Sequence, residues 1–157
     1  MRSLSPEVEQ AKSAIYMVIE ELIDSQEALV EIGEKLGDRT LRRFFLTESL
    51  KRAQFRNKLE ALLNQEGVSE IRKSPSIDSA EHPAWWRLRR SMLIGDDFLL
   101  LAKAERSEDT VQKTYANAIS AYLPQAIRGV LSTQVAHIQR PRNYVRAALD
   151  RANKSAA

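Results

Sequence analysis

Apolar residues recur three and four positions apart along four long stretches of this chain. That spacing puts them on one face of an α-helix, which completes a turn every ~3.6 residues. The chain has only 5 glycines and 5 prolines, which argues against a turn-rich all-β fold. The pattern therefore predicts an all-α fold with helices at about 5–36, 39–64, 97–122 and 125–153.

Two of the connections between these helices are short, and one is long. The short ones predict two antiparallel helical hairpins, the first helix with the second and the third with the fourth. The segment 65–96 is long enough to run the length of a bundle, and its residues 84–93 are expected to form a short amphipathic helix. Such a crossover is typical of ferritin-like four-helix bundles, although a simple up-down-up-down order also fits. We expect a single domain over residues 1–157.

Each apolar face is interrupted by polar residues near the middle of its helix. Because these positions lie at similar heights, they predict a buried polar layer across the bundle. Glu48 and Arg52 are four residues apart and are expected to form an ion pair, with Glu108 on the other side of the guanidinium group. The expected members of this network are Gln26, Glu48, Arg52, Glu108, Tyr115 and Gln134.

Di-iron carboxylate bundles hold their metal at the same height, with a Glu on each of two helices and Glu-x-x-His on the other two. This chain departs from that pattern, because Lys51 stands where the second helix needs a His, and Gln134 replaces the Glu that precedes His137. Arg52 also brings a fixed positive charge into the layer. We therefore expect no metal and no cofactor. The alternative is an iron or manganese centre whose ligands are Glu48, Glu108 and His137.

Several short motifs are spread along the predicted helices. They are Val18-Ile19-Glu20 with Asp24 and Glu27, Leu36 before Asp38 and Leu41, Arg52-Ala53-Gln54-Phe55, Gly95-Asp96-Asp97, Ala104-Glu105-Arg106-Ser107-Glu108-Asp109 through Tyr115, and Ile138-Gln139-Arg140 with Val145-Arg146. Over roughly residues 15–149, the set resembles a bacterial family of uncharacterised four-helix-bundle proteins, a domain-of-unknown-function family placed among ferritin-like folds. The resemblance implies a self-associating ferritin-like bundle without an assigned reaction.

The chain also departs from that family at two places. Ser107 stands where a Gly is usual, and Pro141-Arg142-Asn143 replaces a stretch that commonly ends in His-Asp. A metal-binding or catalytic role of that family histidine is therefore not carried over to this chain.

Composition narrows the chemistry that the chain can carry. It has 157 residues, no cysteine and two histidines, which excludes disulfides, zinc–thiolate sites and cysteine nucleophiles. The sequence has no phosphate-binding loop, dinucleotide fingerprint or Ser-His-Asp set, and no apolar run approaches the ~18 residues of a membrane span. We expect a non-enzymatic, cytoplasmic bundle with a structural or stress-associated role, and we assign no catalytic residue.

The crossover segment offers a second alternative function. Trp85 and Trp86 are followed by Arg87, Arg89 and Arg90, and interleaved aromatic and basic residues can bind nucleic acid or an anionic membrane surface. A net charge of only +3 favours neither partner. The simpler interpretation is that the tryptophans pack the crossover against the bundle or form a subunit contact.

Charge is unevenly distributed among the predicted helices. The first helix carries eight acidic residues against two lysines, whereas Arg128 to Lys154 contains six basic residues and Asp150 as its single acid. Either the two helices are neighbours whose flanks attract each other, or their faces meet between subunits. The sequence leaves both interpretations open, and we expect a homo-oligomer, a dimer or larger.

Overall fold

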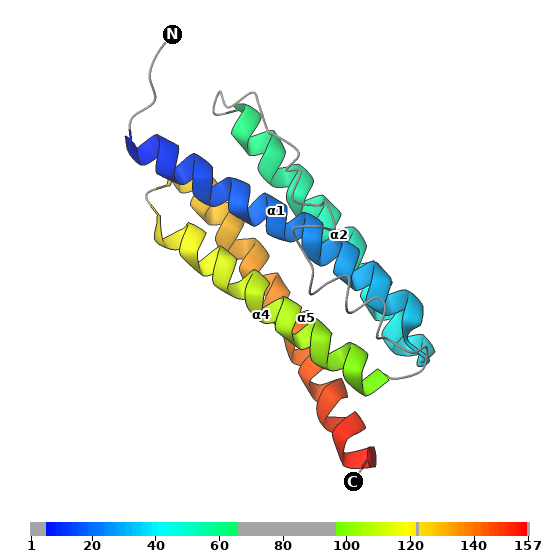
Figure 1. Ribbon diagram of the computed structural model, residues 1–157. Coiled ribbons are helices and arrows are strands. Elements are labelled where there is room, and N and C mark those ends of the chain that lie inside the picture. Colours follow the sequence, from blue (N-terminus) through cyan, green and yellow to red (C-terminus); the bar gives the residue numbers. More distant parts are fainter. Residues whose placement is uncertain (1–5, 66–96, 122, 157) are drawn as a thin grey trace, which may run out of the picture.

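The computed structural model describes residues 6–65, 97–121 and 123–156. All regular secondary structure in these ranges is helical, which confirms the all-α four-helix fold (Figure 1). The helices are α1 (Pro6–Lys35), α2 (Arg39–Gln65), α4 (Asp97–Ser120) and α5 (Gln125–Ala156). The short helix expected in the crossover lies outside the described residues. In the described part of the chain, no helix has an apolar stretch long enough to cross a membrane.

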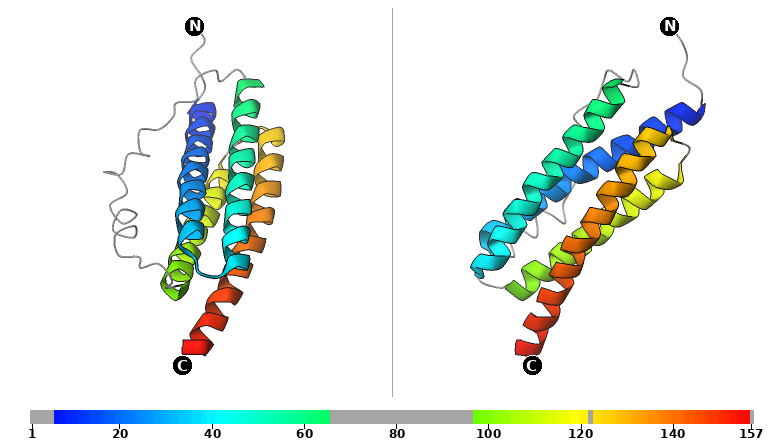
Figure 2. Two further views of the ribbon diagram at one scale, coloured as in Figure 1. Left: turned by 90° about the vertical axis from the view of Figure 1, so that its right-hand side faces the viewer. Right: turned by 180° about the vertical axis from the view of Figure 1, so that it is seen from behind.

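The two hairpins pack side by side in a bundle (Figures 1 and 2). α1 packs against α2 and α4, and α5 packs against α4 and α2. The Asp97 carboxylate at the start of α4 accepts hydrogen bonds from the backbone N–H groups of Gly37 (2.8 Å) and Asp38 (3.2 Å) in the α1–α2 turn. α2 and α4 therefore begin at the same end of the bundle. This is the one-crossover order of ferritin-like bundles, which the sequence left open.

Side chains close the helix ends at both hairpin turns. The Asp38 carboxylate accepts a hydrogen bond from the N–H of Leu41 at 3.0 Å and so caps α2. Arg42 Nη2 donates to the carbonyl of Leu36 at 2.9 Å, just beyond the end of α1. In the other turn, Arg128 donates to two carbonyls at the end of α4, at 2.8 and 3.0 Å. These bonds satisfy backbone groups that a helix terminus leaves without an intrahelical partner.

Buried apolar side chains form two clusters, one toward each end of the bundle. The first combines the N-terminal part of α1, the C-terminal parts of α2 and α4 and the first half of α5. The second combines the opposite parts of the same four helices. Between and beside these clusters, the buried polar side chains are Ser25, Glu48, Ser49, Arg52, Glu108 and Gln134.

Gly33 lies where α1 passes close to α2. A Cβ atom at this position would be 3.1 Å from Phe45 Cβ and 3.3 Å from Leu46 Cδ2. Phe45 is fully buried, and its Cβ cannot move without moving the backbone of α2. Gly129 on α5 is the opposite case, because no atom lies within 4 Å of a Cβ placed there.

Replacing Gly33 by alanine should therefore destabilise the bundle. We expect Gly33→Ala to lower the free energy of unfolding by about 1–2 kcal/mol, because overpacking outweighs the roughly 1 kcal/mol that alanine gains in helix propensity. The matched variant Gly129→Ala should gain up to about 1 kcal/mol. Urea denaturation followed by circular dichroism measures both values. Equal stabilisation by the two substitutions would contradict the close approach of α1 to α2.

Candidate functional site

The layer where the two apolar clusters meet is organised around Arg52 of α2. Its side chain is fully buried. Nη2 donates to both carboxylate oxygens of Glu108 on α4, at 2.7 and 2.8 Å, and Nη1 donates to Ser25 Oγ on α1 at 3.3 Å. Ser25 Oγ in turn donates to the carbonyl of Leu22 at 3.2 Å. One guanidinium group thus connects three of the four helices.

Burial and charge act on Glu108 in opposite directions. Removal from water favours the neutral acid and raises the pKa of the Glu108 carboxyl, and the nearby Glu48 carboxylate raises it further. The positive charge and hydrogen bonds of Arg52 lower it, but burial is the largest effect, so the pKa is raised from its ordinary value. The ion pair is therefore held at a considerable cost in desolvation.

Glu48 does not make the ion pair with Arg52 that the sequence suggested. Its Oε1 lies 3.3 Å from Lys51 Nζ, and its Oε2 lies 3.5 Å from His137 Nε2 on α5. Glu48 Oε2 and His137 Nε2 are buried, and neither makes a hydrogen bond. Residues four apart are offset by about 40° round a helix, so Glu48 turns toward α5 while Arg52 reaches across the bundle to Glu108.

A second set of hydrogen bonds links α4, α5 and α2. The Tyr115 hydroxyl donates to Gln134 Oε1 at 2.7 Å, and Gln134 Nε2 donates to the backbone carbonyl of Phe55 at 3.2 Å. Burial raises the pKa of Tyr115, so this phenol stays protonated and acts as a donor. The ring of Phe55 also meets the edge of His137, with ring centroids 5.4 Å apart. The sequence could not reveal the bond to Phe55, because Gln134 binds its backbone carbonyl, a group that every residue carries.

The remaining expected site residues lie outside this network or outside the described chain. Gln26 is half-buried, and its neighbour Ser25 is the α1 residue that bonds to Arg52. One position along a helix is a rotation of about 100°, so only one of the two can face the guanidinium group. The proposed binding surface of the crossover lies outside the described residues; it comprises Trp85, Trp86, Arg87, Arg89 and Arg90.

The donors in the layer do not suit a dinuclear metal centre. Both oxygens of Glu108 accept hydrogen bonds from Arg52, whose permanent positive charge repels a metal cation. Glu48 and His137 lie close to each other, but Glu108 is bound to Arg52 and does not join them as a third metal ligand. Among residues 6–65, 97–121 and 123–156, no three His, Asp or Glu side chains form a group that could hold a metal ion.

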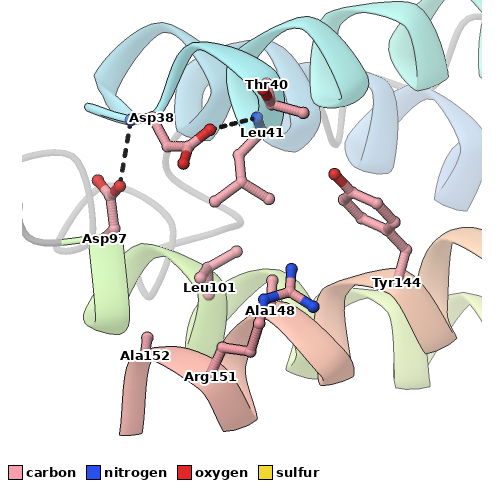
Figure 3. A pocket seen from close by; sticks show the side chains of 9 residues that line it. All are labelled: Asp38, Thr40, Leu41, Asp97, Leu101, Tyr144, Ala148, Arg151 and Ala152. Atoms are coloured by element: carbon pink, nitrogen blue, oxygen red, sulfur yellow. Dashed lines mark hydrogen bonds between the residues drawn. The ribbon is translucent and has the colours of Figure 1, made fainter. Parts of the chain in front are cut away.

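A pocket of about 260 Å³ lies at the end of the bundle where α2 and α4 begin (Figure 3). Asp38 and Asp97 on its rim already accept the backbone hydrogen bonds that hold the α1–α2 turn. Tyr144 and Arg151 point toward the space from α5, and the Tyr144 ring stacks on Phe44 with centroids 4.0 Å apart. Because its carboxylates have structural partners, the pocket is a weaker candidate site than the buried layer.

Comparison with solved structures identifies the fold. A two-domain protein from Anabaena variabilis, with DJ-1/ThiJ/PfpI-like and ferritin-like domains, matches with a TM-score of 0.72. The match covers 93% of this chain and 40% of that chain, so this chain spans less than half of the neighbour's length. At 14% sequence identity, the likeness shows the fold alone.

Comparison of sequences identifies the family. No curated protein matches the chain. A family model matches residues 10–121, which are most of the chain and include α1, α2 and α4 almost completely. The resemblance noted from the short motifs is thereby confirmed. The chain therefore belongs to the family described as Domain of unknown function (DUF2383).

Proposed function

We propose that this chain is a non-enzymatic ferritin-like bundle with a structural or stress-associated role, in which a buried ion pair stands where related bundles hold metal. The observation that carries the proposal is the environment of Arg52. Its side chain is fully buried, and a single nitrogen, Nη2, lies 2.7 and 2.8 Å from the two oxygens of Glu108. A guanidinium group cannot lose its charge in a protein, so this layer permanently contains a cation supplied by the chain itself.

The hydrogen bonds of the layer keep its protons in place and do not favour proton transfer to or from a substrate. A general acid or base needs a free oxygen or nitrogen within reach of a substrate. Both oxygens of Glu108 are occupied by Arg52, and the Tyr115 hydroxyl is occupied by Gln134. Glu48 Oε2 and His137 Nε2 make no hydrogen bond, but both atoms are buried and face each other at 3.5 Å. The Glu108 side chain is 2% exposed, which leaves no room for a substrate beside it. These contacts support a structural function for the layer.

The structural function we infer is to fix how the two hairpins fit together. Arg52 belongs to the α1–α2 hairpin and Glu108 to the α4–α5 hairpin, so their bond joins the hairpins at one height. A shift of one hairpin by a helical turn, about 5.4 Å, would leave both charges buried without a partner. Apolar clusters alone tolerate such shifts better, because one aliphatic contact can replace another.

Removing one charge of the pair should be far more harmful than removing both. We expect Glu108→Leu to lower the free energy of unfolding by about 3–5 kcal/mol, because Arg52 then stays charged without a partner. Arg52→Met should also destabilise the bundle, but by less, because the Glu108 carboxyl, whose pKa burial raises, can then take up a proton and become neutral. The double variant Arg52→Met/Glu108→Leu should return to within about 1 kcal/mol of the wild type, because no buried charge remains. Chemical denaturation of the four proteins gives the complete cycle.

The Arg56–Glu60 pair is the matched control for that cycle. It lies on α2 as well, and its nitrogen–oxygen distance is 2.6 Å, but its side chains are 25% and 28% exposed. Arg56→Ala or Glu60→Ala should therefore cost less than about 1 kcal/mol. If the single substitutions at Arg52 and Glu108 cost no more than these, the buried pair does not have the role proposed.

Metal content tests the proposal directly against the di-metal alternative. The chain should contain less than about a tenth of an equivalent of iron or manganese after untagged purification from cells supplied with both metals, because Arg52 occupies the layer that a di-metal site needs. Mass spectrometry of the metals in the purified protein measures this. A content near two equivalents per chain, lost on Glu48→Ala, would overturn the proposal in favour of an oxidase or storage protein.

A further inference from the structure

Two opposite edges of the bundle carry opposite charge. On α1, acidic residues follow one another at spacings of four, three, four and three, which keeps them on a single side of the helix. Every one of them is exposed or half-buried, whereas the core face of α1 is apolar. We call this set the acidic face; it comprises Glu20, Asp24, Glu27, Glu31 and Glu34.

The C-terminal half of α5 is the basic counterpart. Its exposed arginines and lysine are interrupted by Asp150 alone among acidic residues. We call the basic face the three residues that share one side of the helix, Arg140, Arg151 and Lys154; Arg146 is turned toward α4, where its Nη1 lies 3.6 Å from Glu105 Oε2. From Glu20 to Glu34 and from Arg140 to Lys154, the two faces cover equal numbers of residues, or about 21 Å of helix each.

The bundle keeps these two faces apart. α1 packs against α2 and α4, and α5 packs against the same two helices, so α1 and α5 occupy diagonal corners (Figure 2). The interpretation that α1 and α5 attract each other as neighbours within one chain is therefore wrong. Their outer faces point in opposite directions, and salt screens charges across that separation.

We propose that the acidic face of one copy of this chain binds the basic face of a second copy. Charge complementarity indicates that the partner of each face is a second copy of the chain, because every copy carries both faces and the two faces have the same length. Since the faces lie on diagonal corners, a copy that binds one partner through α1 still offers α5 to another. Contacts of this heterologous kind produce rings or open chains rather than a closed two-fold dimer. The proposal depends on the charge and place of the faces, and it is independent of the buried ion pair.

Charge exchange between two variants tests this interface. The acidic-face variant carries Glu20→Lys and Glu34→Lys, and the basic-face variant carries Arg140→Glu and Lys154→Glu. Sedimentation velocity should show wild-type assemblies that weaken at least about tenfold between roughly 50 and 500 mM NaCl. Each variant alone should lose most of its association, because two charge exchanges remove nearly all of the negative charge of the acidic face or all of the positive charge of the basic face. An equimolar mixture of the two variants should form pairs, because the first variant keeps its basic face and the second keeps its acidic face.

The control variant carries Arg106→Glu and Lys113→Glu on exposed positions of α4, outside both faces. It changes the net charge as much as the basic-face variant does, and it should assemble like the wild type. The proposal is overturned if the control loses association equally, if the mixture stays dissociated, or if the wild type is monomeric at low salt. Binding of duplex DNA by a monomeric wild type, lost in the basic-face variant, would likewise overturn it and assign the basic face to a polyanion.

Discussion

The bond between Arg52 and Glu108 is the constraint around which the bundle is arranged. A guanidinium group that is fully removed from water must be paired, because an isolated buried charge costs several kcal/mol. The pair in this chain joins helices from different hairpins, with both carboxylate oxygens bound by one nitrogen. The apolar clusters lie on either side of this pair, in the arrangement that brings the two charged side chains to the same height.

The rest of the layer adapts to that pair. Ser25 accepts from the second guanidinium nitrogen, and the Tyr115–Gln134 contact closes the neighbouring space between α4 and α5. Hydrogen bonding in the layer is incomplete, because Arg52 Nε, Glu48 Oε2 and His137 Nε2 are buried and make no hydrogen bond. Partly satisfied networks contribute less stability than fully satisfied ones. This favours a layer that specifies one arrangement of the hairpins over a layer that maximises stability.

The fold of this chain does not determine which polar residues lie in its buried layer. Across almost its whole length, the chain matches a two-domain protein that contains a ferritin-like domain, at an identity of only 14%. Such a fold constrains helix lengths, crossing and connection, which depend on apolar faces of the right size rather than on particular residues. The polar residues at mid-height are under no such constraint, so the same architecture can accommodate either metal ligands or an ion pair there.

The sequence by itself determined which residues are helical and which side of each helix faces inward. Spacings of three and four residues predicted the four helices. The same periodicity located Glu48, Arg52, Glu108 and Gln134 among buried positions, because inward position depends only on rotation about the helix axis.

Only the tertiary structure decided what lies across from each inward side chain. Glu108 is near the middle of α4, so it lies at mid-height whichever end of the bundle α4 starts from. Its position therefore could not distinguish the one-crossover order from the up-down-up-down order. The partner of Arg52 was likewise open, because Glu48 is nearer in sequence while Glu108 is nearer in space. The diagonal placement of α1 and α5 was also hidden. Periodicity describes one helix at a time, whereas partners depend on how helices distant in sequence are brought together.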